Sequence, residues 1–280
     1  MALSIFTNGS SMASVNALNK SNSMLSTAME RLGTGKRINS AADDAAGLQI
    51  ASRLQGQSNG MAVAQRNISD ATALLQTAEG AFDEVSNIMY RMKDLATQAA
   101  NDTNTAKDRT AISDELTELG KELTNIMGNT SYGGDKLFAA DGKLTKEMNF
   151  QIGASADEAM AVDLSANLTT ASTAITGLAG TAALTDAASA KALITSVESG
   201  LEAVGTIRSS LGANINRLGH TSANLANMKD NTDLALGNVR DADFATEAST
   251  MTRNQMLAQT SMSMLKQSNS MSGMVMSLLG

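Results

Sequence analysis

Residues 66–100 read RNISDATALLQTAEGAFDEVSNIMYRMKDLATQAA, and the spacing of their apolar side chains decides the fold. Apolar residues in alternating steps of three and four are typical of a helix that buries a narrow seam against other helices. Here the steps continue without a slip through Ile68, Ala71, Leu75, Ala78, Phe82, Val85, Met89, Met92, Ala96 and Ala99. The pattern predicts one long helix over about residues 57–100.

The same spacing recurs elsewhere in the chain. It predicts an N-terminal helix over about residues 8–32, a shorter helix from Ile112 to Ile126, a return helix over about residues 191–235 and a final helix from Phe244 to Leu279. Consecutive helices of this kind pack most economically as an up-and-back bundle with both termini at one end. The predicted fold class is mainly α, a long antiparallel helical bundle or coiled coil with a small β-hairpin region.

The hairpin is predicted where the apolar period changes to two. Apolar residues alternate with polar ones on both sides of the turn residues GASADE: Met148, Phe150 and Ile152 before it, and Met160, Val162 and Leu164 after it. Such alternation around a turn is typical of a β-hairpin. The following residues 166–190 are low in charge and rich in Ala, Thr and Gly, so we expect a short surface linker that can include short helical pieces.

The composition favours uninterrupted helices and excludes several kinds of protein. The 280 residues include no Pro, the commonest helix breaker, and no Cys, which rules out disulfide frameworks and thiolate metal sites. The net charge of −7 argues against nucleic acid as a partner, because proteins that bind it carry a basic stripe. No window is apolar enough to span a membrane, and the first residues lack the blocks of a secretory signal, so we expect neither membrane insertion nor signal-dependent secretion.

Both ends of the chain are poor in charge. Residues 70–166 hold 17 of the 28 acidic residues, whereas residues 1–29 carry one charged residue and residues 248–280 carry two. Because one neighbouring helix cannot cover all the apolar sides of the final helix, we expect that helix to be disordered in the single chain and to order on assembly. We expect both termini to form a helical coiled coil with a core shared between copies, which includes Val15, Leu18, Leu25, Leu32, Phe244, Met251, Met262, Leu265, Met276 and Leu279.

The alternative for the C-terminal segment is a helix that lies on a membrane surface. Such helices carry Lys and Arg along their polar face. This segment instead carries Ser, Asn, Gln and Thr there, which favours packing against other helices.

Few residues are candidates for chemistry. His220 is the single histidine and lies within a predicted helix, where a surface role is the usual interpretation. Asp43 and Asp44 are adjacent, so their carboxylates point to different sides of a helix, and capping or ion pairing with Lys36 and Arg37 is the simpler interpretation. No nucleotide-binding or metalloprotease motif is present in a fitting context. We therefore expect no catalysis, no cofactor and no bound metal.

Six motifs stand out near the two ends of the chain. They are TAMERLGTGKRINSAADDAAGLQIASRL (residues 27–54), QRNISDATALLQTAEGAFDEV (65–85), IMYRMKDLATQAAND (88–102), IRSSLGANINRL (207–218), VRDADFATEASTMTRNQML (239–257) and VMSLLG (275–280). These motifs resemble those of bacterial flagellins, stand in the family's order and cover most of residues 1–165 and 190–280. The opening residues and the Met-rich character look more like lateral flagellins than polar ones.

The resemblance implies a structural subunit that polymerises with itself through its terminal helices into the helical flagellar filament used for swimming or swarming. By resemblance, residues 1–40 are the N-terminal inner-core helix and the start of a connecting spoke, and residues 41–165 are the outer-tube helices and hairpin. Residues 166–190 are a short linker in place of variable outer domains. Residues 191–235 are the return outer-tube helix, and residues 236–280 are the C-terminal inner-core helix.

The resemblance also implies partners and contact residues. Beyond its own copies, the implied partners are the flagellar export apparatus, an export chaperone, and the hook-associated and cap proteins, with an extracellular filament as the destination. Lys36, Arg37, Asp43 and Asp44 in the spoke are implied to make polar contacts between subunits. Contacts with a vertebrate Toll-like receptor are implied for Arg91, Leu95, Gln98 and Glu115.

Two other interpretations stay open at this point. A hook-filament junction protein would share the terminal helices, but such relatives match residues 30–47 less closely. A cytosolic coiled-coil scaffold would share the seams, but should carry charged termini and regular charge pairs beside the seam.

Overall fold

The computed structural model describes residues 8–180 and 184–279, with side chains described as far as residue 271. The chain forms two compact units, residues 1–56 with 231–280, and residues 57–230. The predicted mainly α fold with a small hairpin is confirmed. The elements are α1 (Gly9–Thr34), α2 (Ala45–Ala99), α3 (Ala106–Asn129), β1 (Ser131–Tyr132), β2 (Asp135–Lys136), the 3₁₀ turn η1 (Lys143–Thr145), β3 (Met148–Gln151), β4 (Ala159–Val162), α4 (Ser165–Ala179), α5 (Ala187–Arg240) and α6 (Phe244–Leu279).

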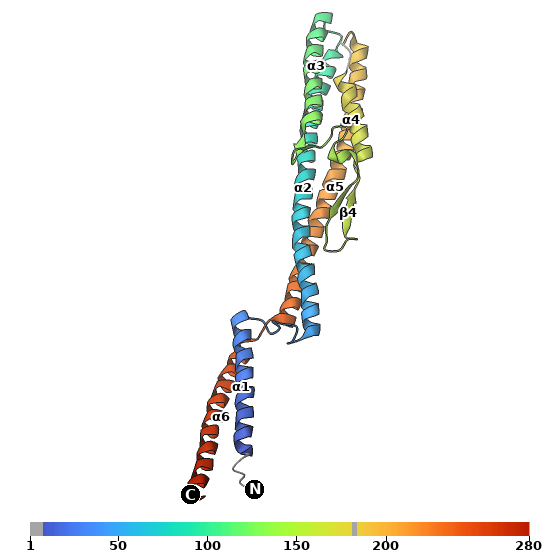
Figure 1. Cartoon of the computed structure of the whole chain (residues 1–280). Helices are drawn as coiled ribbons and strands as arrows, with labels where there is room; N and C mark the ends of the chain where they lie inside the picture. Colours follow the sequence, from blue (N-terminus) through green and yellow to red (C-terminus); the bar gives the residue numbers. More distant parts are fainter. Residues whose placement is uncertain (1–7, 181–183, 280) are drawn as a thin grey trace. The chain divides into compact units, whose positions relative to one another are not determined.

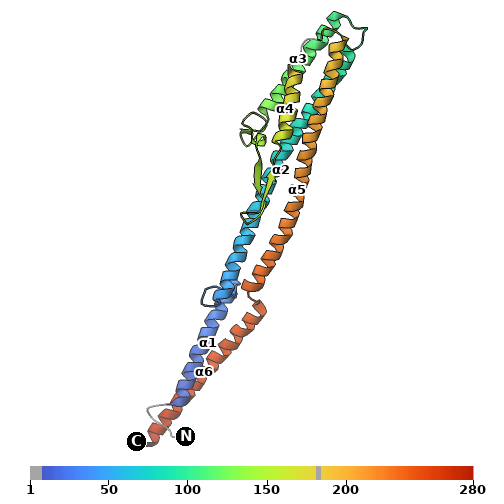
Figure 2. The ribbon, with the colours of Figure 1, turned by 90° about the vertical axis from the view of Figure 1, so that its right-hand side faces the viewer.

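In the first unit, α1 and α6 lie side by side and antiparallel (Figures 1 and 2). The Arg31 guanidinium pairs with the Glu247 carboxylate at 3.0 Å, where α1 ends and α6 begins. At the other end of the pair, the Asn8 side-chain amide donates to the Ser268 hydroxyl at 2.9 Å. Bonds at both ends fix the direction of pairing, and the expected pairing of the two terminal helices is confirmed.

In the second unit, α2 and α5 run antiparallel, with α3, α4 and the hairpin packed along them (Figure 1). The direction follows from two ion pairs, Glu79 with Arg208 at 2.8 Å and Lys93 with Glu198 at 2.9 Å. All ten seam residues predicted between Ile68 and Ala99 are buried. The uninterrupted seam thus keeps one side of α2 buried along this core.

The helices extend beyond their predicted ends. The long helix was expected from residue 57, but α2 begins at Ala45, because the Asp44 carboxylate accepts from the Gly47 N–H at 2.9 Å and caps its first turn. Similarly, α3 begins at Ala106, before the first seam residue, because Thr105 and Asp108 form a reciprocal capping box. Caps rather than seams therefore set these boundaries.

The predicted hairpin is confirmed as β3 and β4, which pair antiparallel with Phe150 opposite Met160. It docks on α2 through the Asn67 side-chain amide, which donates to the Gln151 carbonyl at 3.3 Å. A second, two-residue hairpin, β1 with β2, was not predicted. It turns at two glycines with φ of 63° and 91°, values that side chains disfavour.

The prediction of a surface linker over residues 166–190 is wrong for its first half. This half is α4, a packed helix whose apolar residues recur every three or four positions and are buried: Leu168, Ala171, Ile175 and Leu178. Its many Thr and Ala residues resemble a linker in composition. The helical spacing of four apolar residues nevertheless outweighs composition, because α4 can bury them against the second unit's core.

The approach of α3 to α4 depends on Gly120. A Cβ at this position would lie 2.9 Å from the Cα of Ala179. We expect Gly120→Ala to lower the free energy of unfolding of the second unit by about 1–3 kcal/mol, measured by urea titration. Gly128→Ala is the matched control, because a Cβ there meets nothing within 4 Å and should stabilise the helix by up to about 1 kcal/mol. Equal effects of the two substitutions would contradict this account of the contact.

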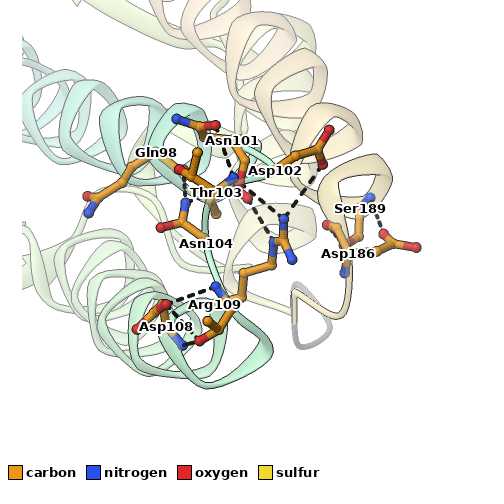
Figure 3. Close-up of polar contacts among 11 residues, drawn as sticks. Gln98, Asn101, Asp102, Thr103, Asn104, Asp108, Arg109, Asp186 and Ser189 are labelled. Carbon is orange, nitrogen blue, oxygen red and sulfur yellow. Dashed lines mark hydrogen bonds and ion pairs between the residues drawn. The ribbon is translucent and has the colours of Figure 1, made fainter.

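The loop between α2 and α3 is held by Arg109 (Figure 3). Its guanidinium donates to the carbonyl oxygens of Ala99 at 3.0 Å and Asn101 at 3.1 Å, so it caps the carboxyl end of α2. The Asn104 side-chain amide donates to the Gln98 carbonyl at 2.5 Å. The loop therefore depends on hydrogen bonds rather than on buried apolar side chains.

An aspartate lies at or near the start of every helix after α1 and accepts local hydrogen bonds that lower its pKa below 3.8. The main donors are the backbone N–H groups of Ser40 and Ser189 and the hydroxyls of Thr105, Ser165 and Thr246. They act respectively on Asp43, Asp186, Asp108, Asp163 and Asp243. Such bonds favour the charged carboxylate at the positive end of a helix.

These aspartates predict helices that are lost in acid. A carboxylate whose pKa is lower in the folded chain stabilises it above the unfolded pKa, and this contribution disappears as the pH falls through the folded value. Helical content, followed by circular dichroism, should therefore fall below about pH 4. Asp186→Ser is the control for α5, because a serine cap does not titrate. Constant helical content down to about pH 2 would contradict the prediction.

Candidate assembly surface

The seam between α1 and α6 is built from small and polar side chains. Ser21 and Ala28 on α1, and Asn254 and Ala258 on α6, are each less than 9% exposed. Of the apolar residues predicted for this core, Leu18, Leu25, Leu32, Met251 and Leu265 are half-buried. Small side chains let two helices approach closely, so the pair closes through them rather than through its bulkiest residues.

Ten other bulky apolar residues of α1 and α6 are exposed. Three of the predicted core residues are among them, with Val15 38%, Met262 47% and Phe244 59% exposed. The side chains of Met276 and Leu279 lie outside the described residues. The other exposed members on these two helices are Met12, Met24, Met29, Met256, Leu257, Met264 and Met271. We refer to all ten exposed residues as the outer apolar set.

The outer apolar set has no cover within the described chain. Single exposed apolar residues are ordinary, but a concentration on two neighbouring helices indicates a surface that packs against something else. The helices carry few charges, so solvation of these sides is poor. The surface is fit for packing against further helices of the same kind.

The segment between α1 and α2 pairs with the segment between α5 and α6 near Lys36. Lys36 and Asp241 are β-bridge partners, and the Arg37 backbone N–H donates to the Arg240 carbonyl at 2.7 Å. The Arg37 guanidinium also donates to the Val239 carbonyl at 2.8 Å, near the carboxyl end of α5. We refer to residues 35–38 and 239–242 as the joint.

Of the two aspartates of the predicted spoke, Asp44 caps a helix and Asp43 holds the turn before it. Asp43 accepts from the backbone N–H groups of Asn39 at 3.1 Å and Ser40 at 2.8 Å, and Asp44 caps α2. Of the two interpretations of these residues, the structure favours capping, because the described ion pairs do not join Asp43 or Asp44 to Lys36 or Arg37. The carboxylates thus shape the segment between α1 and α2.

The four residues implied in receptor contact lie on or beside one exposed face of the second unit. Arg91 and Glu115 form an ion pair at 2.6 Å and are 56% and 46% exposed. Gln98 is exposed, whereas Leu95 is only 3% exposed. The polar members are thus accessible, and the Leu95 side chain packs in the core.

Sequence reasoning missed several residues that organise the first unit. The Arg31–Glu247 pair, with Glu247 12% exposed, joins the terminal helices. Arg240 donates to the Gln55 side chain at 3.2 Å beside the joint. No local pattern in the sequence marks these ion-pair and hydrogen-bond partners. The seam itself could have been found from its small residues, but a search for large apolar residues does not detect them.

Comparison with known proteins identifies the family. Residues 5–143 match the bacterial flagellin N-terminal helical region, and residues 194–279 match the bacterial flagellin C-terminal helical region. A flagellin of Halalkalibacterium halodurans is 39% identical over 253 residues, which cover 90% of each chain. The chain belongs to the bacterial flagellin family. It is therefore a structural subunit that polymerises with its own copies into a flagellar filament, and the expectation that it is not an enzyme is confirmed.

Other relatives differ in how similar they are to this flagellin in sequence and in structure. Flagellin A of Vibrio anguillarum is 34% identical over an alignment of 381 residues that covers all of both chains. A putative flagellar hook-associated protein from Vibrio parahaemolyticus shares the fold, with a TM-score of 0.58 and 17% identity over 71% of this chain and 100% of that one. Relatives include polar flagellins of Vibrio parahaemolyticus, such as one at 32% identity, so the lateral subtype stays a prediction.

Two further kinds of feature are absent from the described residues, metal-ion clusters and membrane-spanning helices. Within them, no three His, Asp or Glu side chains are grouped to hold a metal ion. None of the helices searched there combines the length and hydropathy that membrane crossing requires.

Proposed function

We propose that α1 and α6 form the inner core of the filament by packing the outer apolar set of each copy against the terminal helices of other copies. The observation that carries this proposal is that small side chains fill the fully buried positions of the α1–α6 pair, whereas ten bulky apolar ones are exposed. Burial of an exposed Leu or Met contributes about 1.5–3 kcal/mol, so several such residues per copy supply a strong drive to assemble.

The contacts between copies are heterologous in this proposal. The outer apolar set includes residues of both helices, so one face of a copy can meet a different face of the next. Contacts of this kind generate open helical polymers when the rotation between copies does not close a ring. A helical filament is the expected product.

The other parts of the chain are assigned to the filament's layers by their resemblance to the family. Residues 41–165 and 191–235 would form the outer tube, and residues 1–40 and 236–280 the inner core with the spoke. The 381-residue alignment with Vibrio anguillarum Flagellin A exceeds this chain's 280 residues, so that relative carries insertions absent here. This supports a filament without large outer domains, with α4 near the site of the missing insertion.

Secretion and further partners also rest on family membership. The proposal includes export by the flagellar apparatus to the cell exterior, an export chaperone, and contacts with hook-associated and cap proteins at the filament ends. The hook-junction alternative has less support, because its structural relative is only 17% identical.

The joint is proposed to carry polar contacts between subunits through Lys36 and Arg37, with Asp43 and Asp44 shaping the segment. We expect Arg37→Glu to shorten filaments or prevent their formation, since a carboxylate there also faces the negative end of α5. Electron microscopy of filament length tests this, with Arg37→Lys as the control that keeps the charge. Filaments of normal length from Arg37→Glu would contradict the prediction.

Recognition by a Toll-like receptor is a further proposal. Arg91, Gln98 and Glu115 are accessible for it, whereas Leu95 could act only by supporting its neighbours. Purified single chains applied to receptor-bearing cells test it, with Arg91→Ala as the matched variant. Silence of the unmodified chain in that assay would end the proposal.

The central experiment follows the terminal helices into the polymer. Hydrogen exchange is recorded on the purified single chain, then again after assembly is seeded with filament fragments and checked by electron microscopy. Fast exchange at residues 1–35 and 245–280 that becomes protected in filaments supports the proposal. Protected termini in a chain that never polymerises would instead mean a closed bundle, and the proposed packing of α1 and α6 between copies would have to be abandoned.

A further inference from the structure

Methionine dominates the outer apolar set. Seven of its ten members are methionines: Met12, Met24 and Met29 on α1, and Met256, Met262, Met264 and Met271 on α6, each between 46% and 61% exposed. We refer to these seven as the terminal methionines. Among the exposed bulky apolar residues described elsewhere in the chain, Met228 is the single methionine.

Four methionines in the second unit's core are buried, in contrast to the exposed terminal methionines. Met61, Met89, Met92 and Met160 are at most 4% exposed. A thioether that an aqueous oxidant cannot reach reacts slowly, so the terminal methionines should react faster than these four. Met127, Met148 and Met251 are half-buried and lie between the two groups in solvent access.

The composition leaves thioethers as the main target for two-electron oxidants. The chain contains no Cys and no Trp, so thiol and indole chemistry is absent. Methionine is oxidised to its sulfoxide, which is polar and chiral and disrupts Met-rich interfaces. A sulfoxide in the outer apolar set would place a polar group in the surface proposed to pack against other copies.

We propose that the terminal methionines are a reversible oxidation site through which peroxide controls assembly. The sulfur lone pair attacks one oxygen of hydrogen peroxide, the S–O bond forms as the O–O bond breaks, and proton transfer releases the other oxygen as water. The sulfur loses two electrons and the peroxide gains them. The sulfoxides make the outer apolar set polar in the single chain, whereas packing in the filament shields the same sulfurs.

This inference rests on the proposed packing of α1 and α6, and the experiment separates the two. The full-length chain is treated with hydrogen peroxide, either unassembled or as filaments, and each methionine is followed by peptide mass spectrometry. Seeded assembly of the treated and untreated single chain is then measured. An untreated chain that fails to assemble would count against the proposed function and not against the oxidation chemistry.

In the unassembled chain, the terminal methionines should oxidise at least about tenfold faster than Met61, Met89 and Met92. The critical concentration for assembly should rise at least about tenfold, which corresponds to about 1.4 kcal/mol of association free energy. Methionine sulfoxide reductases of both epimer specificities should restore assembly. In filaments, the same sulfurs should react more slowly than in the single chain.

The control variant replaces all seven terminal methionines by leucine, a swap that keeps volume and apolarity. It should assemble equally well before and after peroxide treatment. Loss of assembly by the peroxide-treated leucine variant, or full assembly of a chain oxidised at the terminal methionines, would overturn the proposal. If the leucine variant assembles poorly even without peroxide, the test is the oxidised unmodified chain after treatment with the reductases. Failure of that chain to regain assembly once its sulfoxides are fully reduced would overturn the proposal.

Discussion

Replacing Leu257 and Met264 together by aspartate is expected to abolish polymerisation. Both side chains belong to the outer apolar set, at 47% and 61% exposure, so the single chain should tolerate the change. In the proposed filament each position loses about 1 kcal/mol of apolar burial, because about half of each side chain is already covered in the single chain, and a buried unpaired carboxylate costs several kcal/mol more. A combined loss above about 4 kcal/mol raises the critical concentration by more than about a thousandfold.

The measurement is seeded assembly followed by light scattering and electron microscopy. The matched control is Leu257→Met with Met264→Leu, which changes the same positions but keeps them apolar, and it should assemble normally. Thermal unfolding of the second unit should be the same in both variants. Filaments from the aspartate variant at ordinary concentration would mean that these sides of α6 face solvent in the polymer.

The second large effect is on stability rather than assembly. Phe82 is fully buried in α2, and its ring lies 4.8 Å, centroid to centroid, from that of Phe138. We expect Phe82→Ala to lower the free energy of unfolding of the second unit by about 3–5 kcal/mol, because the cavity adds to the lost transfer free energy. Urea titration followed by circular dichroism measures it.

The same substitution at Phe244 is the control for Phe82→Ala. Phe244 is 59% exposed on α6, so Phe244→Ala should change that unfolding free energy by less than about 0.5 kcal/mol. It should weaken assembly instead, since Phe244 belongs to the outer apolar set. Two variants with one chemical change would thus separate the folding core from the assembly surface, and a large loss of stability from Phe244→Ala would contradict that separation.

The sequence patterns did not predict the starts of α2 and α3 or the helix α4. A seam marks only the turns that face a partner, so the capped first turns of α2 and α3 were missed. Composition misled for residues 166–190, because Ala and Thr are common both in linkers and in helices packed on a core. Capping by Asp44 and by the Thr105–Asp108 pair was detectable in principle, but it competes with many similar sites along any chain.

The sequence by itself determined the mainly α fold, the long seam from Ile68 to Ala99, the hairpin near residues 148–162 and the flagellin motifs, because periodicity and motifs are local. Only the tertiary structure decided which side of each terminal helix meets the other. A period near 3.5 identifies an apolar stripe, but α1 and α6 carry several, and a sequence cannot rank them. Close approach of two backbones favours the stripe with Ser21, Ala28, Asn254 and Ala258, and it leaves the bulky methionines outside for other copies to cover.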